Sequence, residues 1–214
     1  SNTEWFTKQG NDPYTSVSQA SDMTLTIPSG QFMDAYVMVT TPKGSKVRRD
    51  MLLADLGIVR DLTKLDNEFT VSHENSGGKD AGEGSSKLTD NNITTKWYVG
   101  SVNDAYFWWQ FEYFQPQIIN GYSMTSGNDS ESRDPKNWDF LGSNDGTNWI
   151  VLDSRAEELF NTGGPDASKP GRRATRIFSF DNTTPYTFYR MHIKARLSSG
   201  SFQLSEFRML QLPR

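Results

Sequence analysis

Residues 88–97 read Leu-Thr-Asp-Asn-Asn-Ile-Thr-Thr-Lys-Trp, and this stretch, taken with Leu204–Glu206 near the C-terminus, decides the fold. Asp90 supplies a carboxylate, Thr95 supplies a hydroxyl, and the polar loop between them can turn its carbonyls inward. Such hard oxygen donors suit calcium. Glu206 adds a second carboxylate if the first and last strands of a β-sandwich lie side by side. Because Asp, Asn and Thr are also ordinary turn residues, a solvated turn is the alternative interpretation.

The composition is that of a polar protein with one full hydrophobic core. The chain has 214 residues, of which 35% are hydrophobic, and its mean hydropathy is −0.67. This length favours one main domain with an extension. No apolar run approaches the roughly 18 residues that cross a bilayer. No signal peptide is evident at Ser1, so we expect a soluble protein or one whose leader has been removed.

Several classes of function are disfavoured by the residues that the chain lacks. Without cysteine it has no disulfide, thiolate metal site or cysteine nucleophile. A net charge of −4 with scattered basic residues makes a nucleic-acid partner unexpected. No Ser-His-Asp motif, zinc signature or glycine-rich phosphate loop is present. The acidic pair Glu157 and Glu158 are sequence neighbours, which cannot oppose each other across a glycosidase cleft. We therefore expect no enzyme activity.

Short alternating runs between Gly, Asn, Asp and Pro clusters predict an all-β protein, an antiparallel β-sandwich. The expected strands are Met23–Ile27, Ala35–Thr40, Trp108–Tyr113, Ile118–Thr125, Trp138–Gly142, Ile150–Ser154, Arg176–Phe180, Tyr189–Ala195 and Gln203–Leu210.

The first part of the chain differs in style from the remainder, which is rich in aromatic residues and turns. The change at Asp66–Glu68 predicts a small β-rich extension over residues 1–68 and a main domain over residues 69–214. Within the extension, Lys46–Val59 is the one helical candidate, and a strand with a bulge is the alternative because Gly57 interrupts the run.

An ordered series of motifs runs through the main domain: Leu88, Asp90, Asn92, Thr95, Trp97; Trp109, Gln110, Phe111; Ile119, Gly121, Tyr122; Ser126–Asp129; Arg133–Lys136, Trp138; Gly142–Gly146, Trp149; Tyr189, Arg190; Gln203, Ser205, Glu206. In this order and spacing, residues 69–212 resemble a discoidin domain, also called the coagulation factor 5/8 type C domain. The fold is shared with family 32 carbohydrate-binding modules. The resemblance implies a galactose-binding-domain-like jelly roll of eight strands whose termini lie close together.

The resemblance also implies a structural calcium ion. Its ligands would be the side chains of Asp90, Thr95 and Glu206, with backbone carbonyls near Leu88 and Asn92. The family usually has Gly at the position of Asn91 in this chain, so the loop must reach any left-handed conformation with Asn, which tolerates it. Loss of the ion should loosen the fold first and ligand binding second.

In such modules, ligands are held by loops at one end of the sandwich. Here these loops are Glu74–Ser86, Tyr98–Tyr106, Asn128–Pro135, Asn161–Arg173 and Leu197–Ser201. A sugar site needs an aromatic ring for stacking and planar polar groups for adjacent hydroxyls. The polar candidates are Arg133, Asn128 and Asp129, and the stacking candidates are Tyr98, Tyr106 and Phe202. The alternative is that Arg133 pairs with Asp134 or Glu131 and Asn128 caps a turn.

Other aromatic and imidazole side chains are assigned to the scaffold. Four tryptophans occupy strand positions that the fold would bury: Trp97, Trp109, Trp138 and Trp149. Neither His73 nor His192 falls clearly where galactose-binding relatives carry a loop histidine, which argues against galactose specificity.

The leading hypothesis is a non-catalytic carbohydrate-binding module whose partner is a glycan or glycoprotein, within a larger multidomain or surface assembly. An adhesion or protein-interaction module using the same loop face is the alternative. Membrane lipid is the least favoured partner, since the loops carry Asp, Asn, Ser and Gly in place of apolar spikes with nearby Lys or Arg. We expect an extracellular, cell-surface or periplasmic location.

Overall fold

The structure, a computed structural model, describes residues 2–8, 15–16, 32–40, 44–54, 59–102, 106–196 and 200–213. They form two compact units, residues 1–59 with 213–214, and Arg60–Leu212, here called the sandwich domain. The division precedes Arg60, whereas the sequence placed it after residue 68. Residues 60–68 belong to the sandwich because β5 (Arg60–Asp61) pairs with β15 (Glu206–Gln211). Leu62, only 3% exposed, lies in the core.

The N-terminal unit is a four-stranded antiparallel sheet with the order β2-β1-β3-β4. Its strands are β1 (Asn2–Lys8), β2 (Thr15–Ser16), β3 (Phe32–Thr40) and β4 (Lys46–Ala54). The helix considered over Lys46–Val59 is wrong, since this segment pairs with β3 from Lys46 to Ala54. Gly44 at the preceding turn has a φ of 83°, a conformation that glycine adopts freely and that suits a hairpin. The expected strand Met23–Ile27 lies outside the described residues.

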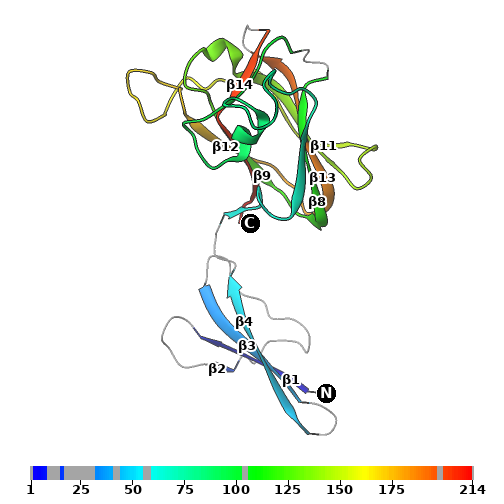
Figure 1. Cartoon of the computed structure of the whole chain (residues 1–214). Coiled ribbons are helices and arrows are strands. Elements are labelled where there is room, and N and C mark those ends of the chain that lie inside the picture. The colour runs from blue at the N-terminus through cyan, green and yellow to red at the C-terminus, as the bar shows by residue number, and fades with distance from the viewer. Residues whose placement is uncertain are drawn as a thin grey trace. The chain divides into compact units, whose positions relative to one another are not determined.

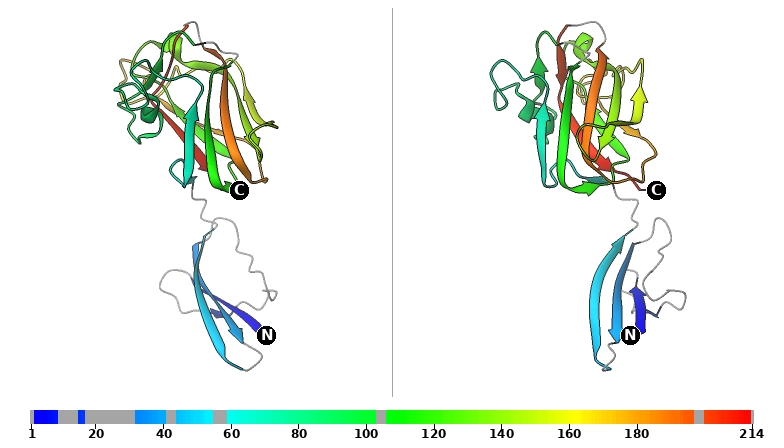
Figure 2. Two further views of the ribbon diagram at one scale, coloured as in Figure 1. Left: turned by 45° about the vertical axis from the view of Figure 1, so that its right-hand side comes forward. Right: turned by 90° about the vertical axis from the view of Figure 1, so that its right-hand side faces the viewer.

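The sandwich domain contains two larger antiparallel sheets, which Figure 2 shows as two layers, and one two-stranded sheet (Figure 1). The strand orders are β11-β10-β13-β8-β6, β12-β9-β15-β5 and β14-β7. The bounds of the strands and 3-10 helices are β6 (Asn67–Val71), η1 (Ser85–Thr89), β7 (Trp97–Val99), β8 (Trp108–Gln117), β9 (Gly121–Thr125), η3 (Glu131–Arg133), β10 (Pro135–Ser143), β11 (Ile150–Arg155), β12 (Thr175–Ser179), β13 (Tyr186–Arg196) and β14 (Phe202–Leu204).

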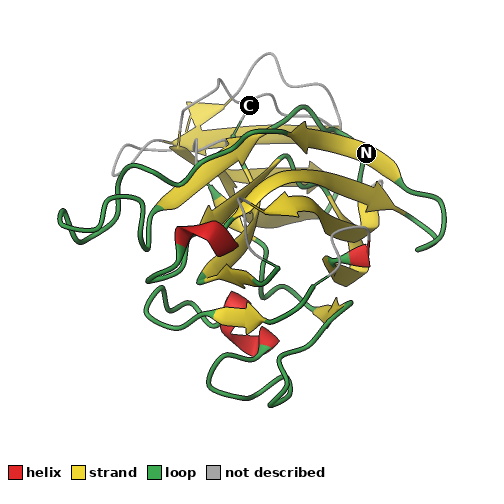
Figure 3. Cartoon of the chain, turned by 90° about the horizontal axis from the view of Figure 1, so that it is seen from above, coloured by secondary structure: helices red, strands yellow, loops and turns green. Residues whose placement is uncertain are grey.

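The predicted all-β, antiparallel class is confirmed, and Figure 3 shows strands and loops with only short helical turns. One expected strand, Gln203–Leu210, is two strands in the structure. β14 pairs with β7, whereas β15 pairs with β9, and the chain changes partner at Ser205. This switch places Glu206 at the start of β15. No helix among the described residues is long and apolar enough to span a membrane.

Aromatic rings fill the space between the sheets. Trp97, Trp109 and Trp138 are fully buried, as the sequence predicted. Trp149 is only half-buried, and the guanidinium carbon of Arg190 lies 4.1 Å from the centre of its ring. Buried rings of this size contribute much of the apolar area that stabilises a domain. The rigid core fixes the strand ends from which the functional loops leave.

Candidate functional site

The first candidate site is the loop that follows η1. The hydroxyl of Thr95 donates to the Asp90 carboxylate at 2.8 Å and contacts the Asn92 carbonyl oxygen, also at 2.8 Å. The backbone N–H of Asn92 donates to the same carboxylate at 3.0 Å. Asn91 has a φ of 65°, so it adopts the left-handed conformation expected where the family usually has Gly. The Thr95 hydroxyl thus lies within hydrogen-bonding distance of both the Asp90 carboxylate and the Asn92 carbonyl oxygen.

Glu206, which lies near the C-terminal end of the sequence, contacts this loop directly. Its carboxylate is almost fully buried and accepts the backbone N–H groups of Asn91 at 3.2 Å and Asn92 at 3.0 Å. Burial raises the pKa of Glu206 to about 7 against the opposing effect of Arg208, and the negative charge of Asp90 adds to the rise. The two carboxylates therefore repel each other electrostatically.

The structure brings together four of the five predicted metal ligands, and the fifth, Leu88, has its side chain buried in the core just before them. In the described part of the chain, no three Asp, Glu, His or Cys side chains are grouped closely enough to hold a metal. At this loop only two of the described carboxylates, those of Asp90 and Glu206, could act as ligands. Two carboxylates, a hydroxyl and a loop carbonyl form a donor set that fits a hard cation such as calcium. The calcium site itself stays a prediction.

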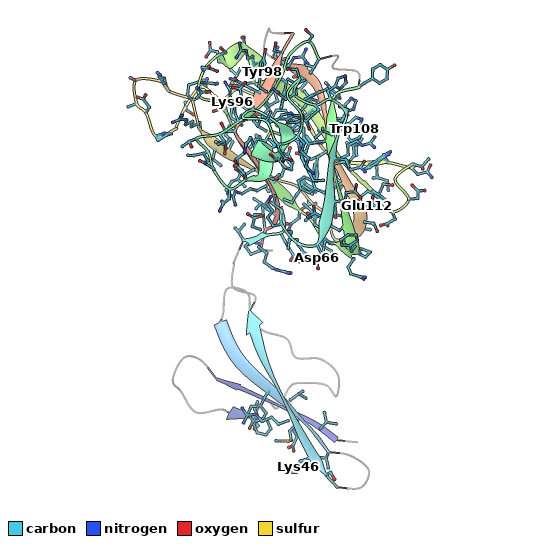
Figure 4. The ribbon with its side chains drawn as sticks, viewed as in Figure 1. Lys46, Asp66, Lys96, Tyr98, Trp108 and Glu112 are labelled. Carbon is cyan, nitrogen blue, oxygen red and sulfur yellow. The ribbon has the colours of Figure 1, made fainter. Side chains whose placement is uncertain are left out.

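A second cluster lies at the loop end of the domain, where Figure 4 shows Lys96 and Tyr98 close together near β14. The Arg133 guanidinium carbon lies 4.9 Å from the centre of the Tyr98 ring, and Arg133 Nη1 lies 3.8 Å from Asp129 Oδ1. Tyr98 also donates its hydroxyl to Ser201 at 3.3 Å. Arg133 thus pairs with Asp129. The alternative interpretation paired it with Asp134 or Glu131, and among the described residues no ion pair links Arg133 to either of them.

Sequence reasoning missed Lys96, whose ammonium group joins the polar residues of this cluster. Its side chain is nearly buried, and its Nζ atom donates to Asp129 at 3.0 Å and to Gln203 at 3.1 Å. Glu83 lies 3.5 Å from the same atom. Burial alone would raise the pKa of Asp129, but the hydrogen bond and the charge of Lys96 outweigh it, and the pKa is lowered. The only sequence signal was a lysine directly before a core tryptophan.

Gln203 positions the loop that carries Asp129. The side chain of Gln203 is fully buried, and its amide donates to the backbone carbonyls of Asp129 and Ser130. A Cβ atom at Gly127 would lie 2.5 Å from Gln203 Nε2, so only glycine leaves room for this contact. The close approach fixes the base of the loop.

An ion pair buried within the domain joins two of the predicted ligand loops. Arg172 donates to Asp134 at 3.0 Å and to the carbonyl of Asp129 at 3.1 Å. Asp134 is 1% exposed, and its burial raises its pKa to about 6 although Arg172 opposes the shift. Asn128 lines a hollow of about 110 Å³ beside this pair, together with Lys169 and Arg173. The ion pair therefore ties the loop of Asn161–Arg173 to the loop of Asn128–Pro135.

One predicted ligand residue is wrong. Phe202 is fully buried, with its ring centre 4.6 Å from Phe107 and 5.4 Å from Trp97, because β14 turns this side chain inward. Tyr106 is 69% exposed and Tyr98 is half-buried, so both can be reached from solvent. Residues 103–105 and 197–199 of the predicted loops lie outside the described residues.

Comparison with known proteins identifies the domain. The sequence profile of the F5/8 type C domain matches residues 68–207. The chain belongs to the F5/8 type C family. Structural similarity agrees with the assignment and confirms the discoidin-like sandwich.

Two solved structures illustrate the shared fold. An F5/8 type C domain from Bacteroides fragilis has a TM-score of 0.55 and 16% identity, over 73% of this chain and 97% of the other. The family 32 carbohydrate-binding module of NanJ from Clostridium perfringens, solved with galactose, has a TM-score of 0.54 and 10% identity, over 72% of this chain and 100% of that module. At these identities the likeness shows the fold alone.

One curated relative is an enzyme. The peptide-N(4)-(N-acetyl-beta-glucosaminyl)asparagine amidase of Arabidopsis thaliana is 28% identical over 120 residues, which cover 51% of this chain. The match covers 17% of the length of that enzyme.

Proposed function

We propose that the F5/8 type C domain is a non-catalytic carbohydrate-binding module that recognises a glycan or glycoprotein through its loop end. The observation that carries the proposal is the grouping of Tyr98, Asp129 and Arg133, held from below by Lys96. A planar guanidinium beside an ionised carboxylate can hold two adjacent sugar hydroxyls, because one donates and the other accepts. The galactose complex of the Clostridium perfringens module supports this class of ligand.

The stacking surface in this proposal is Tyr106, with Tyr98 as a rim residue. The guanidinium of Arg133 lies over the Tyr98 ring, which leaves that face less available to a sugar. Tyr106 is far more exposed and belongs to the connection between β7 and β8. An aromatic ring at a loop edge can pack against the apolar side of a pyranose.

Calcium is the proposed structural cofactor of the module. The side chains of Asp90, Thr95 and Glu206 would hold it, with the backbone carbonyls of Leu88 and Asn92. When bound, the ion neutralises the two facing carboxylates and links the loop to β15. Hydrogen bonds within the protein orient the two carboxylates. Thr95 fixes the orientation of Asp90, and the N–H groups of Asn91 and Asn92 fix that of Glu206.

The module would act as part of a larger extracellular, cell-surface or periplasmic assembly. The similarity to part of a plant glycoprotein amidase is consistent with a region that sits beside a glycan-processing activity. We propose no catalytic role for this domain, because its clustered polar residues are paired with one another in a manner that suits hydroxyl recognition.

A glycan array probed with the calcium-loaded protein tests the proposal. Arg133→Ala should reduce binding to the selected glycan at least tenfold. Arg155→Ala is the matched control, because its side chain is also 30% exposed and also forms one ion pair, on β11. Equal loss in both variants, or no glycan bound by the folded protein, would contradict sugar recognition and leave the loop face to a protein partner in adhesion.

A further inference from the structure

A separate pocket lies along β6, the edge strand of the five-stranded sheet, and is here called the β6-edge pocket. It encloses about 240 Å³ between β6, the turn that precedes it and the segment around η1. It shares no lining residue with the loop-end cluster of Lys96, Tyr98, Asp129 and Arg133. Two of its lining residues, Lys79 and Ser86, belong to the loop Glu74–Ser86, and Glu83 of this loop lies 3.5 Å from Lys96 Nζ.

The charge of this pocket is one-sided. Lys64 and Lys79 both line it, and no carboxylate does. Neither ammonium group forms an ion pair with any carboxylate in the part of the chain that the structure describes, whereas Lys96, Lys136 and Lys194 all do. Lys64 instead donates to the hydroxyl of Thr89 at 3.1 Å. Two cations at one hollow repel each other, and an anion bound between them would offset this repulsion by attracting both.

The pocket also has an aromatic floor. Phe69 from β6 is half-buried, and its ring centre lies 5.0 Å from that of the buried Phe111 on β8. Ser86 also lines the pocket and contributes a hydroxyl side chain. A ligand with an apolar face, hydroxyl groups and one negative charge matches this lining. The volume is below the roughly 300–1,000 Å³ of most ligand pockets, so it suits a single ring more than an oligosaccharide.

We propose that the β6-edge pocket binds one acidic sugar residue, in which Lys64 and Lys79 hold a carboxylate or sulfate and Phe69 packs against the ring. The site has no residue in common with the loop-end cluster and does not require the function proposed for that cluster. It does adjoin the calcium loop: a neighbouring hollow of about 240 Å³ shares Thr63, Lys64 and Thr89 with it and extends to Asn91 and Glu206. Thr89 directly precedes Asp90, so the wall of the pocket continues into that loop.

Isothermal titration of the full chain with galacturonate, galactose 6-sulfate, galactose and inorganic sulfate tests the proposal. The two acidic sugars should bind at least tenfold more tightly than galactose or inorganic sulfate, and their affinity should fall as sodium chloride is raised. Lys64→Gln and Lys79→Gln should each weaken acidic-sugar binding about tenfold. Lys87→Gln is the matched control, because it removes the same charge from the same segment and does not line the pocket.

Other outcomes would overturn the proposal. In the Arg133→Ala background, galactose binding as tightly as galacturonate would remove the role of the charge. Inorganic sulfate binding as tightly as galactose 6-sulfate would remove the role of the sugar ring. An equal loss in Lys87→Gln would reduce the effect to net charge. Arg133→Ala separates the two sites, because it removes the sugar contact proposed at the loop end and does not line the β6-edge pocket. In this background galacturonate should still bind, and Lys64→Gln should still weaken that binding about tenfold. Complete loss of galacturonate binding in Arg133→Ala would transfer the acidic sugar to the loop end.

Discussion

Asn92 donates its backbone N–H to the carboxylate of Glu206 at 3.0 Å, across 114 positions of sequence. Asn91 donates to the same carboxylate, so one buried side chain fastens the polar loop to the beginning of β15. Without a cation, this fastening brings a second carboxylate, Asp90, near the first. The effect of Glu206 on the stability of the domain therefore tests this arrangement of the two carboxylates.

Glu206 should make the calcium-free protein less stable as the pH rises. The folded-state pKa of about 7 lies above the unfolded value of 4.5, so between these values the folded state holds a proton that the unfolded state has released. Stability is then highest below about pH 4.5, as far as this group is concerned, and falls towards pH 7. Thermal melting in a chelator from pH 5 to 8 should show this slope.

Glu206→Gln provides the control for that slope. Asp134, whose pKa is also raised, contributes to the pH dependence of both proteins, so the difference between them reports on Glu206. The difference should be steepest from pH 5 to 7. A wild-type curve parallel to that of Glu206→Gln would contradict the assignment.

Calcium should raise the melting temperature by several degrees, and Asp90→Asn should abolish the rise. The carboxylate of Asp90 accepts one backbone N–H and one hydroxyl within its turn. Asp166 does the same with Ser168 in an exposed loop, so Asp166→Asn is the matched control and should retain the calcium response. Scanning calorimetry with calcium and with chelator measures both. An undiminished calcium response in Asp90→Asn would place the ion elsewhere or exclude it.

Gly127→Ala should weaken both the fold and glycan binding. The added methyl group would lie 2.5 Å from Gln203 Nε2 and 2.6 Å from its Cδ, which forces Gln203 away from the loop of Asp129. Overpacking of this kind costs about 1–3 kcal/mol. Gly82→Ala is the control, because nothing lies within 4 Å of its added Cβ. Urea unfolding and glycan titration of the two variants should differ, and equal results would remove the role given to Gln203.

Phe202→Ala and Tyr106→Ala should separate scaffold from binding surface. Loss of the buried Phe202 ring should cost about 3–5 kcal/mol of unfolding free energy. Tyr106→Ala, at a side chain 69% exposed, should leave the unfolding free energy within about 0.5 kcal/mol and reduce glycan binding. Chemical denaturation and titration of both variants check this. Unchanged glycan affinity in Tyr106→Ala would exclude it as the stacking ring.

Features written in local residue patterns were predictable from the sequence. Strands β8 to β13 followed from period-two alternation, whereas β1, β6 and β7 were not predicted. The nearness of Glu206 to Asp90 followed from the expected pairing of the sandwich ends. Asn91 was marked by its place in a loop that needs a left-handed residue. In each case the physical requirement is set by a few neighbouring residues.

The remaining features depend on contacts between distant residues. Nothing near Phe202 indicates which way β14 turns, and that direction decided between ligand contact and core. The role of Lys96 depends on Asp129 and Gln203, which accept hydrogen bonds from its ammonium group and lie far from it in the sequence. The first unit ended at residue 59 because two residues, Arg60–Asp61, found a partner at the far end of the sequence. Alternation cannot encode such pairings.

The pairing of β5 with β15 also determines how the sandwich domain responds to mechanical force. Arg60 lies opposite Gln211, and Asp61 lies opposite Leu210, so the chain enters and leaves the domain at adjacent points of one antiparallel ladder. Tension applied through the flanking chain therefore acts first on this short ladder and on the hydrogen bonds between Leu212 and Asn120 beside it. The aromatic core and the loops fixed to it come under load only after these peripheral contacts have separated.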